Sequence, residues 1–408
     1  MGGDVMRKAI LASALLGAVS LSFATNGDNL IGVSPASRGM GGIGVGMPVG
    51  PTDTIFRNPA WMSYYKGFNV SFGGILFFPE VKAKFNNASD TSKSKMFVVP
   101  EVGIVHQIND KLTFGIGAFG VSGMGVDYRD NEGLLRTHTN FQFMRIIPAL
   151  AYKVNDAISV SGAIHLAYGS LDMGATIGTS NAGGGQSQTY GIGAQLGVAY
   201  NMGDFVYAGL TYQSPVSMTY RRVFDSNCLV GSCDGQFEDL KLTQPQELAF
   251  GVGVKPMDNL KVGMDIRFIN WKKAKGYKDF QWKDQLVIAL GGEFKPTQKL
   301  ALRAGYNFGK SPIRGGVKDI TNANRIPNFA EPFSDFDIAF FNLIGFPAIT
   351  EHHITLGLGY EFTKNFSIDL AYEHAFKKKV SATDNTNTFF IEAQNAQNAI
   401  SIGLNWKF

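Results

Sequence analysis

The most constraining feature of this sequence is a two-residue alternation of apolar and polar side chains, which recurs in long segments from about residue 67 onward. In FSIDLAYE, Phe366, Ile368 and Leu370 share one face, whereas Asp369 and Glu373 share the other. Alternation with this period is typical of a β-strand. A soluble β-sandwich also alternates, but it rarely has charges in the middle of many long strands. A lipid-facing exterior and a polar interior explain both properties, so the pattern favours a transmembrane β-barrel.

Turns of two lengths separate the alternating segments. Very short polar turns, such as VND at 154–156 and TKN at 363–365, alternate with long polar connections such as 221–243 and 379–397. Outer-membrane barrels have short periplasmic turns, longer extracellular loops and an even number of strands. The predicted fold is therefore all-β, an antiparallel transmembrane barrel of about 14 strands within residues 67–408. The predicted strands are 67–80, 97–108, 112–125, 141–153, 157–173, 189–200, 204–220, 244–255, 260–271, 285–295, 299–309, 351–362, 366–378 and 399–408.

The segment ISIGLNWKF at 400–408 alternates up to a final phenylalanine. An unpaired backbone amide in the bilayer core is strongly unfavourable, so the last strand must pair with the first and close the barrel. Trp406 and Phe408 are expected in the periplasmic aromatic girdle. The final phenylalanine resembles the signal that the outer-membrane barrel assembly machinery recognises. That machinery, outer-membrane lipid and lipopolysaccharide are the expected partners of the barrel.

The first 24 residues have the order of features of an export signal. Arg7 and Lys8 precede the apolar run AILASALLGAVSLSF, and Ser22-Phe23-Ala24 forms a small-x-small cleavage site. This order predicts a signal peptide at 1–24, rather than a buried helix, and the outer membrane of a Gram-negative bacterium as the location. The formal net charge of +4 is too small to indicate a nucleic-acid partner.

The two cysteines, Cys228 and Cys233, lie in the loop sequence DSNCLVGSCDGQ. Two close cysteines in an exported chain predict a local disulfide. A metal site is the weaker alternative, because no histidine or further cysteine is near. No metal and no cofactor are expected.

Catalytic residues are not predicted, and the chain is expected not to be an enzyme. Its histidines are scattered, and the neighbours His352 and His353 should point to opposite faces of a strand. A serine nucleophile elbow and a metal-spaced cluster are both absent from the sequence. A phospholipase built on a barrel would need a lipid-facing His–Ser pair, which the pattern does not supply.

Residues 25–66 are rich in Gly, Pro and Ser and do not alternate. A disordered periplasmic tail is one interpretation of this composition. Against it stand apolar residues such as Ile31, Ile43, Ile55 and Trp61, which prefer a packed environment. A barrel of this size is too wide for strand side chains to fill, so these residues predict a plug inside the lumen.

The chain resembles the FadL family of outer-membrane transporters of long-chain fatty acids and other hydrophobic compounds. The resemblance rests on NGDNLIGVSPASRGMGGIGV and RNPAWM near the N-terminus, and on GIGAFGVSGMGVDYRD, IPALAYKVND, GLTYQSPVSMTYR and WKDQLVIALGGEFKPTQKLALRAGYNFGKSPI in order after them. It implies a hatch at 25–66 that contains Asp53 and the motif Asn58-Pro59-Ala60. Two departures concern this hatch: it is richer in Gly and Pro, and Trp61 stands where glycine is commoner.

The resemblance also implies a route for the substrate. Extracellular loops capture it, a lumenal pocket binds it, and it leaves sideways at an inward kink in the third strand. Gly117, Gly120 and Gly123 are the candidate residues of this lateral opening, because glycine in a strand marks bulges and bends. The alternative is that these glycines only let the hatch pack closely.

Two further sets of residues are candidates for substrate contact. The connection 328–349 is unusually apolar, and its capture-groove candidates are Phe333, Phe336, Phe340, Phe341, Leu343 and Phe346. The alternative is a lid without a ligand role. Arg145, Arg267 and Arg303 face inward by alternation and are candidates to meet a substrate carboxylate. Pairing with lumenal acids such as Asp265, Glu293 or Asp369 is the equally good alternative.

The sequence therefore predicts a monomeric channel for passive uptake of long-chain fatty acids or other hydrophobic small molecules. A general porin for polar solutes and a barrel-type enzyme remain the alternative interpretations.

Overall fold

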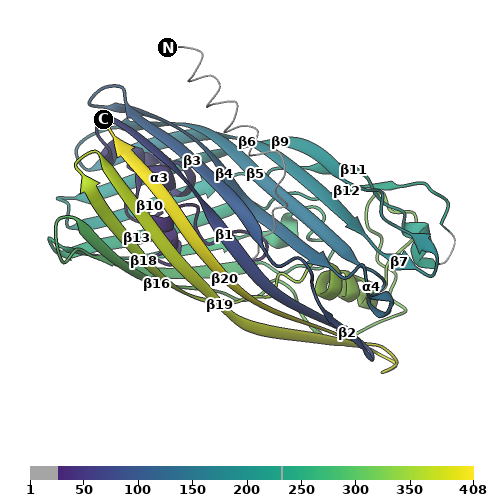
Figure 1. The fold of residues 1–408 in the computed structure, drawn as a ribbon. Helices are drawn as coiled ribbons and strands as arrows, with labels where there is room; N and C mark the ends of the chain where they lie inside the picture. The colour runs from purple at the N-terminus through teal and green to yellow at the C-terminus, as the bar shows by residue number, and fades with distance from the viewer. Residues whose placement is uncertain (1–25, 231–232) are drawn as a thin grey trace, which may run out of the picture.

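The computed structural model describes residues 26–230 and 233–408, so the predicted signal peptide at 1–24 lies outside the described residues. Fourteen long antiparallel strands follow one another around a closed wall (Figure 1). Each pairs with its neighbours in chain order, and β20 pairs with both β19 and β1. The strands are β1 Phe68–Phe85, β3 Phe97–Gln107, β4 Leu112–Asp127, β5 His138–Lys153, β6 Ile158–Gly174, β9 Ser187–Met202, β10 Val206–Gln213, β13 Glu247–Met257, β14 Leu260–Ile269, β15 Gln285–Phe294, β16 Leu300–Gly309, β18 His352–Thr363, β19 Phe366–Asp384 and β20 Phe390–Lys407.

The seam between β1 and β20 is continuous. Their register runs from Asn69 opposite Lys407 to Phe85 opposite Ile391. Phe68 and Phe408 then exchange two backbone hydrogen bonds, of 3.0 and 2.8 Å. The wall therefore has no free edge at its closing strands, as backbone pairing in lipid requires.

The alternation separates the two faces of the wall as the sequence predicts. Ile400 and Ile402 of β20 are exposed on the outside, whereas Ser401 between them is buried. On β14, Phe268 is exposed and the neighbouring Arg267 is buried. The outer surface is apolar and the charges lie inside, which is the arrangement of a barrel in lipid.

Several predicted strand boundaries are wrong, most of all around 204–220 and 379–397. The strand predicted over 204–220 ends at Gln213, because Pro215 cannot donate a ladder hydrogen bond. The predicted loop at 379–397 is mostly a hairpin in which β19 reaches Asp384 and β20 begins at Phe390. This hairpin extends beyond the apolar band, so its strands lack the alternation that reveals the others.

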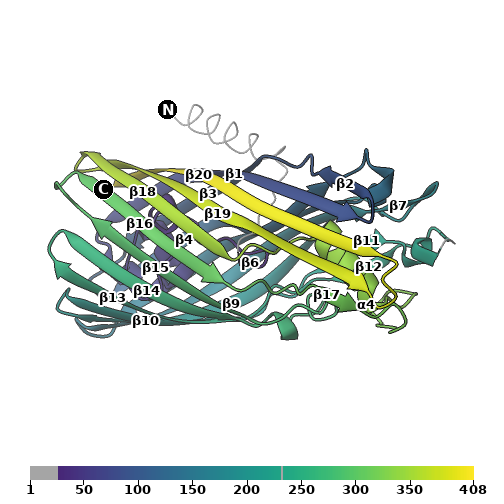
Figure 2. The same cartoon turned by 90° about the horizontal axis from the view of Figure 1, so that it is seen from below.

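The long connections lie at the end opposite the short turns and contain small elements of their own (Figure 2). Among the described residues, no helix is long and apolar enough to cross a bilayer. A disulfide joins Cys228 and Cys233 in one of these connections. The small elements are β2 Ala88–Thr91, η2 Glu132–Leu134, β7 Thr176–Ile177, β8 Ser180–Asn181, β11 Thr219–Phe224, η3 Ser226–Val230, β12 Glu238–Lys241, η4 Trp271–Lys273, β17 Gly316–Lys318, α4 Asp335–Phe340 and the π-helix η5 Phe341–Gly345.

Residues 26–66, which we call the lumenal segment, lie inside the barrel near the end that carries the short turns (Figures 1 and 2). The segment contains three short helices, α2 Pro35–Arg38, α3 Pro51–Arg57 and η1 Pro59–Tyr64. Most of its side chains are buried, and Met40, Ile43 and Trp61 pack in one cluster with wall residues of β9, β10 and β15. Its apolar residues thus occupy the interior that the strand side chains alone do not fill.

Candidate functional site

An apolar pocket of about 420 Å³ lies among the long connections. Helix α4 forms one side of it. Ser334 caps this helix in a capping box. Its hydroxyl accepts a hydrogen bond from Asp337 N, and the Asp337 carboxylate accepts one from Ser334 N. The cap fixes the start of the helix, so that the apolar face of α4 is held over the barrel mouth.

Nine phenylalanines line this pocket, which we call the outer pocket. They come from distant parts of the chain: Phe85, Phe224, Phe280, Phe329, Phe333, Phe336, Phe340, Phe341 and Phe389. Phe280 and Phe341 stack with ring centroids 4.0 Å apart. Of the predicted capture residues, Phe333, Phe336, Phe340 and Phe341 line the pocket. Leu343 is buried away from it, and Phe346 lines a smaller cavity beneath.

The smaller cavity lies next to the outer pocket. It measures about 10 Å³ and shares Met173, Phe280 and Phe341 with the outer pocket. Tyr277 also lines it, and the Tyr277 hydroxyl donates a hydrogen bond to the carboxylate of Asp28 in the lumenal segment. Burial raises the pKa of Asp28 to about 6, although the bond from Tyr277 lowers it. A continuous line of contacts therefore runs from the apolar pocket to the lumenal segment.

The ladder between β3 and β4 is incomplete in the described chain. Its pairing runs from Gln107 opposite Thr113 to Glu101 opposite Phe119, and no further pair of these strands follows. The two sides of the break meet again outside it, where Lys93 N donates to Asp127 O at 3.0 Å. Residues 120–126 of β4 therefore lie beside a break in the wall.

The bent part of β4 pairs with the lumenal segment instead. Leu30 N donates to Val121 O, and Gly123 N donates to Asp28 O, each at 3.0 Å. On its other side β4 stays paired with β5, with a register shift between Gly120 and Ser122. The register shift therefore lies next to Gly120.

The three glycines of β4 have different surroundings. Gly120 lies at the register shift, and Gly123 pairs with the lumenal segment. Gly117 lies in the regular ladder opposite Gly103, where a Cβ would overlap with the ring of Phe119.

Leu30 covers the break from the inside. Its side chain packs in a small cluster with Phe97 and Val99 of β3 and with Ile75 and Phe77 of β1. The inner surface of the wall at the break is thus closed by an apolar side chain of the lumenal segment rather than by neighbouring strands.

The carboxylate of Asp265, on β14, holds the glycine-rich part of the lumenal segment. It accepts three backbone hydrogen bonds, from Gly44, Val45 and Gly46, at 2.7, 2.8 and 2.9 Å. The sequence pattern indicates Asp265 only as a partner for an arginine. An inward acid on a strand and a glycine-rich stretch far from it are the only sequence signals of this contact.

Asn58 of the Asn-Pro-Ala motif joins the lumenal segment to the wall. Its Nδ2 donates to Val45 O at 3.1 Å and to Val198 O of β9 at 3.0 Å, and its Oδ1 accepts from Ala60 N at 3.2 Å. Trp61 Nε1 donates to the same Val45 carbonyl at 2.8 Å. Pro59 begins η1 and thereby fixes the chain direction after Asn58.

Buried charges in the lumen are mostly paired. Arg38 of the lumenal segment forms a buried ion pair with Glu373 of β19. Arg267 pairs with Glu247 at 3.2 Å. Arg303 pairs with Glu293 at 2.8 Å and with Asp369. Two of the three predicted cation candidates thus have acidic partners.

Arg145 differs from the other two arginines. Its Nη1 lies 3.0 Å from His165 Nδ1 and donates to Gln213 Oε1 at 2.8 Å. Within the described chain it forms no ion pair. It lines a cavity of about 20 Å³ together with Arg57 and Arg267.

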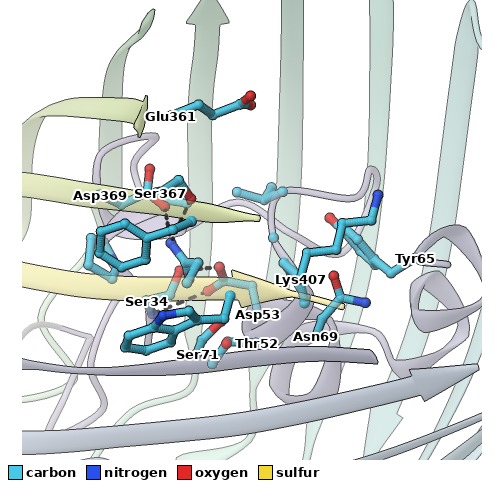
Figure 3. A pocket seen from close by; sticks show the side chains of 18 of the residues that line it. Ser34, Thr52, Asp53, Tyr65, Asn69, Ser71, Glu361, Ser367, Asp369 and Lys407 are labelled. Atoms are coloured by element: carbon cyan, nitrogen blue, oxygen red, sulfur yellow. Dashed lines mark hydrogen bonds between the residues drawn. The ribbon is translucent and has the colours of Figure 1, made fainter. Parts of the chain in front are cut away.

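A second large cavity, of about 510 Å³, lies between the lumenal segment and strands β1, β18, β19 and β20 (Figure 3). It is polar. Asp53 lines it and accepts a hydrogen bond from Ser34 N at 3.2 Å and another from the Ser34 hydroxyl. Burial raises the pKa of Asp53 to about 6 despite these bonds. Asp53 therefore connects α2 and α3 at the edge of the cavity.

A catalytic or metal centre is not assembled by the described residues. The one group with metal-ligating atoms close together is Asp225, Cys228 and Cys233, and its two sulfurs form the disulfide. His352 is exposed and His353 is buried, so the two rings lie on opposite faces of β18. The cavities that the described residues line are candidate binding surfaces.

Comparisons with known proteins agree with this barrel. The family model described as "Outer membrane protein transport protein (OMPP1/FadL/TodX)" matches residues 32–328. The chain is 22% identical to outer membrane protein P1 of Haemophilus influenzae, over 98% of this chain and 99% of that protein. It is 20% identical to the long-chain fatty acid transport protein of Escherichia coli, over 87% of each chain.

Solved structures share the fold. The toluene transporter TodX of Pseudomonas putida superposes with a TM-score of 0.69 at 17% identity, covering 93% of this chain and 99% of that chain. A FadL homologue of Pseudomonas aeruginosa gives a TM-score of 0.69 at 16% identity, covering 94% and 100%. The proteins of this group are outer-membrane transport channels and not enzymes. This chain, a closed barrel matched over most of its length, belongs to the OMPP1/FadL/TodX family of the outer membrane.

Proposed function

We propose that this protein is a channel for the passive uptake of long-chain fatty acids or other hydrophobic compounds, which it releases sideways into the membrane. The observation that carries the proposal is the break between β3 and β4. A line of side-chain contacts begins at the outer pocket and ends at the lumenal segment beside this break. Relatives named as a long-chain fatty acid transport protein and a toluene transporter support the hydrophobic class of substrate.

In the proposed sequence of events, the substrate first enters the outer pocket from the lipopolysaccharide layer. Burial of apolar surface among the phenylalanines favours this step by about 25 cal/mol per Å². The substrate then moves past Tyr277 toward the lumenal segment. Leu30 leaves its position at the break, and the substrate passes between β3 and β4 into the outer leaflet. The lumenal segment prevents direct passage to the periplasm and acts as the hatch.

The wall supplies the remaining partners in this proposal. Its apolar outer face contacts outer-membrane lipid and lipopolysaccharide, and the seam strand β20 is the segment offered to the barrel assembly machinery. The closed wall works as a monomer, because every one of its fourteen strands finds both neighbours within the chain.

A reversible cross-link tests lateral release. Leu30 and Val99 belong to one apolar cluster that spans the break, so the variant Leu30→Cys with Val99→Cys is expected to form a disulfide that holds the break closed. Uptake of a hydrophobic probe into cells that express the variant is expected to fall to background under an oxidant and to recover on reduction. Each single cysteine variant is treated with the same oxidant and reductant as a control. It shows any effect of these reagents that does not come from the new cross-link, including reduction of the native Cys228–Cys233 bond.

Full uptake by the oxidised double variant would contradict lateral release. The porin interpretation makes a different prediction, an ohmic conductance of the wild-type protein in planar bilayers that the cross-link does not change. That result would contradict the hydrophobic channel itself.

A further inference from the structure

One buried polar atom of the outer pocket lacks a hydrogen-bond partner among the described residues, the hydroxyl oxygen of Thr139. Thr139 is 2% exposed, and its side chain points inward from β5. Gly345 faces it without a side chain, since a Cβ at that position would lie 3.7 Å from Thr139 Oγ1. The hydroxyl oxygen is therefore buried in the lining of the pocket without a partner among the described residues, which is unfavourable for a polar group.

The other polar groups of the outer pocket already have partners. Thr137 Oγ1 donates to Leu134 O at 2.8 Å. Ser334 Oγ donates to Asp337 Oδ2 at 2.7 Å in the cap of α4. Thr137 and Thr139 both line the outer pocket, but only the hydroxyl of Thr139 lacks a hydrogen-bond partner among the described residues.

The charges at the outer pocket oppose a carboxylate ligand. Among the described residues that line it there is no lysine or arginine and one acid, Asp337. The imidazole of His138 is the one lining group able to carry a positive charge, and its Nε2 lies 3.5 Å from Asp172 Oδ1. Any charge on His138 is therefore already met by Asp172. A ligand carboxylate would have no cation of its own in apolar surroundings, which is strongly unfavourable.

We infer that the outer pocket selects neutral aromatic compounds with one hydrogen-bonding group, the alkylphenol class. Thr139 determines this specificity. The inference rests on the proposed function. The nine phenylalanines offer ring faces and edges to an aromatic ligand. A cavity of about 150 Å³ holds a benzene molecule, so about 420 Å³ leaves room for a ring with an alkyl chain. The phenol hydroxyl donates to, or accepts from, Thr139 Oγ1.

Binding of three matched probes tests the inference. Equilibrium dialysis of the full chain in detergent, with empty micelles as the reference, gives Kd values for 4-propylphenol, 4-propyltoluene and 4-propylbenzoate. The phenol is expected to bind about three- to ten-fold more tightly than the hydrocarbon, the value of one net hydrogen bond. The benzoate is expected to bind most weakly. Thr139→Val keeps the shape of the side chain and is expected to remove the advantage of the phenol without changing the Kd of the hydrocarbon.

Thr137→Val is the matched control, because its hydroxyl is already bonded within the protein. This variant is expected to keep the wild-type ratio of phenol to hydrocarbon affinity. Equal binding of phenol and hydrocarbon by the wild type, equal weakening of both by Thr139→Val, tightest binding of the benzoate, or no binding of any probe would overturn the inference. The cross-link between residues 30 and 99 does not involve Thr139, so it tests the proposed function separately.

Discussion

The carboxylate of Asp265 accepts a hydrogen bond from the backbone N–H of Val45 at 2.8 Å, and the amides of Gly44 and Gly46 on either side donate to the same carboxylate. A wall strand thus holds three successive amides of the lumenal segment. Such charge-assisted bonds are stronger than neutral ones.

Removal of this carboxylate is expected to loosen the lumenal segment. Asp265→Ala leaves three buried amides without their acceptor, which corresponds to about 2–4 kcal/mol less favourable docking. Hydrogen exchange of the amides at 44–46 measures the change, and exchange is expected to be faster. Asp258→Ala removes an exposed acid of a short turn and is the control. Exchange at the wild-type rate in Asp265→Ala would show that the segment is held by other contacts.

Removal of one partner of the buried ion pair of Arg38 and Glu373 is expected to destabilise the protein more than replacement of both partners. Arg38→Met leaves Glu373 buried without its partner and is expected to destabilise the protein by about 3–5 kcal/mol. The double variant with Glu373→Met is expected to recover much of this loss. Thermal unfolding in detergent gives the comparison. The exposed pair of Arg136 and Glu132 is the control, where Arg136→Met is expected to cost less than about 1 kcal/mol. A double variant no more stable than Arg38→Met would contradict the argument.

Close packing of the lumenal segment against the wall requires glycine at position 209. A Cβ on Gly209 would overlap with the carbonyl of Val45, which accepts hydrogen bonds from Asn58 and Trp61. Gly209→Ala is therefore expected to displace the segment and lower the midpoint of thermal unfolding. Gly162 of β6 has no atom within 4 Å of the position of a Cβ, so Gly162→Ala is expected to be neutral. Equal midpoints for the two variants would refute the close approach.

Docking of the lumenal segment is expected to depend on pH through Asp53. Burial raises its pKa from 3.8 to about 6, so the docked state binds more protons than the undocked state between these values. The stabilisation of the docked state by Asp53 is therefore fully present below about pH 4, and it is lost as the pH rises through 6. Two pKa units correspond to about 3 kcal/mol.

Hydrogen exchange of residues 51–57 measures this dependence, after correction for the intrinsic effect of pH on exchange. The segment is expected to be better protected at pH 5 than at pH 8, and Asp53→Asn is expected to reduce the difference. Asp28 contributes in the same direction, because burial raises its pKa to about 6 as well. Protection that rises with pH would contradict both assignments.

Residue patterns predict the wall well, because lipid imposes a strict rule on it. Every strand residue faces either hydrocarbon or the lumen, so Ile400 and Ile402 reveal their face from the sequence alone. The rule ends where the lipid ends. The outer half of the β19–β20 hairpin pairs polar residues such as Lys379 and Gln394, and the sequence gives no sign of a strand there.

The interior is harder to predict, because its contacts join distant segments. Alternation correctly places Arg267 and Arg303 inside the barrel, but it does not tell which acids they meet. Asp265 faces inward by the same rule, yet it binds backbone amides that lie more than two hundred residues earlier in the chain. The hydroxyl of Thr139 lies opposite Gly345, and only the folded loops bring the two residues together.

The pairing of Leu30 and Asp28 with the bent part of β4 has a consequence for how the barrel is made. A wall inserted without these residues would present the carbonyl of Val121 and the amide of Gly123 unpaired beside hydrocarbon, at a cost of several kcal/mol for each group. The lumenal segment thus pairs with the bent part of β4 as an extra strand would. We therefore expect it to dock as the barrel closes, before the third wall strand is exposed to lipid.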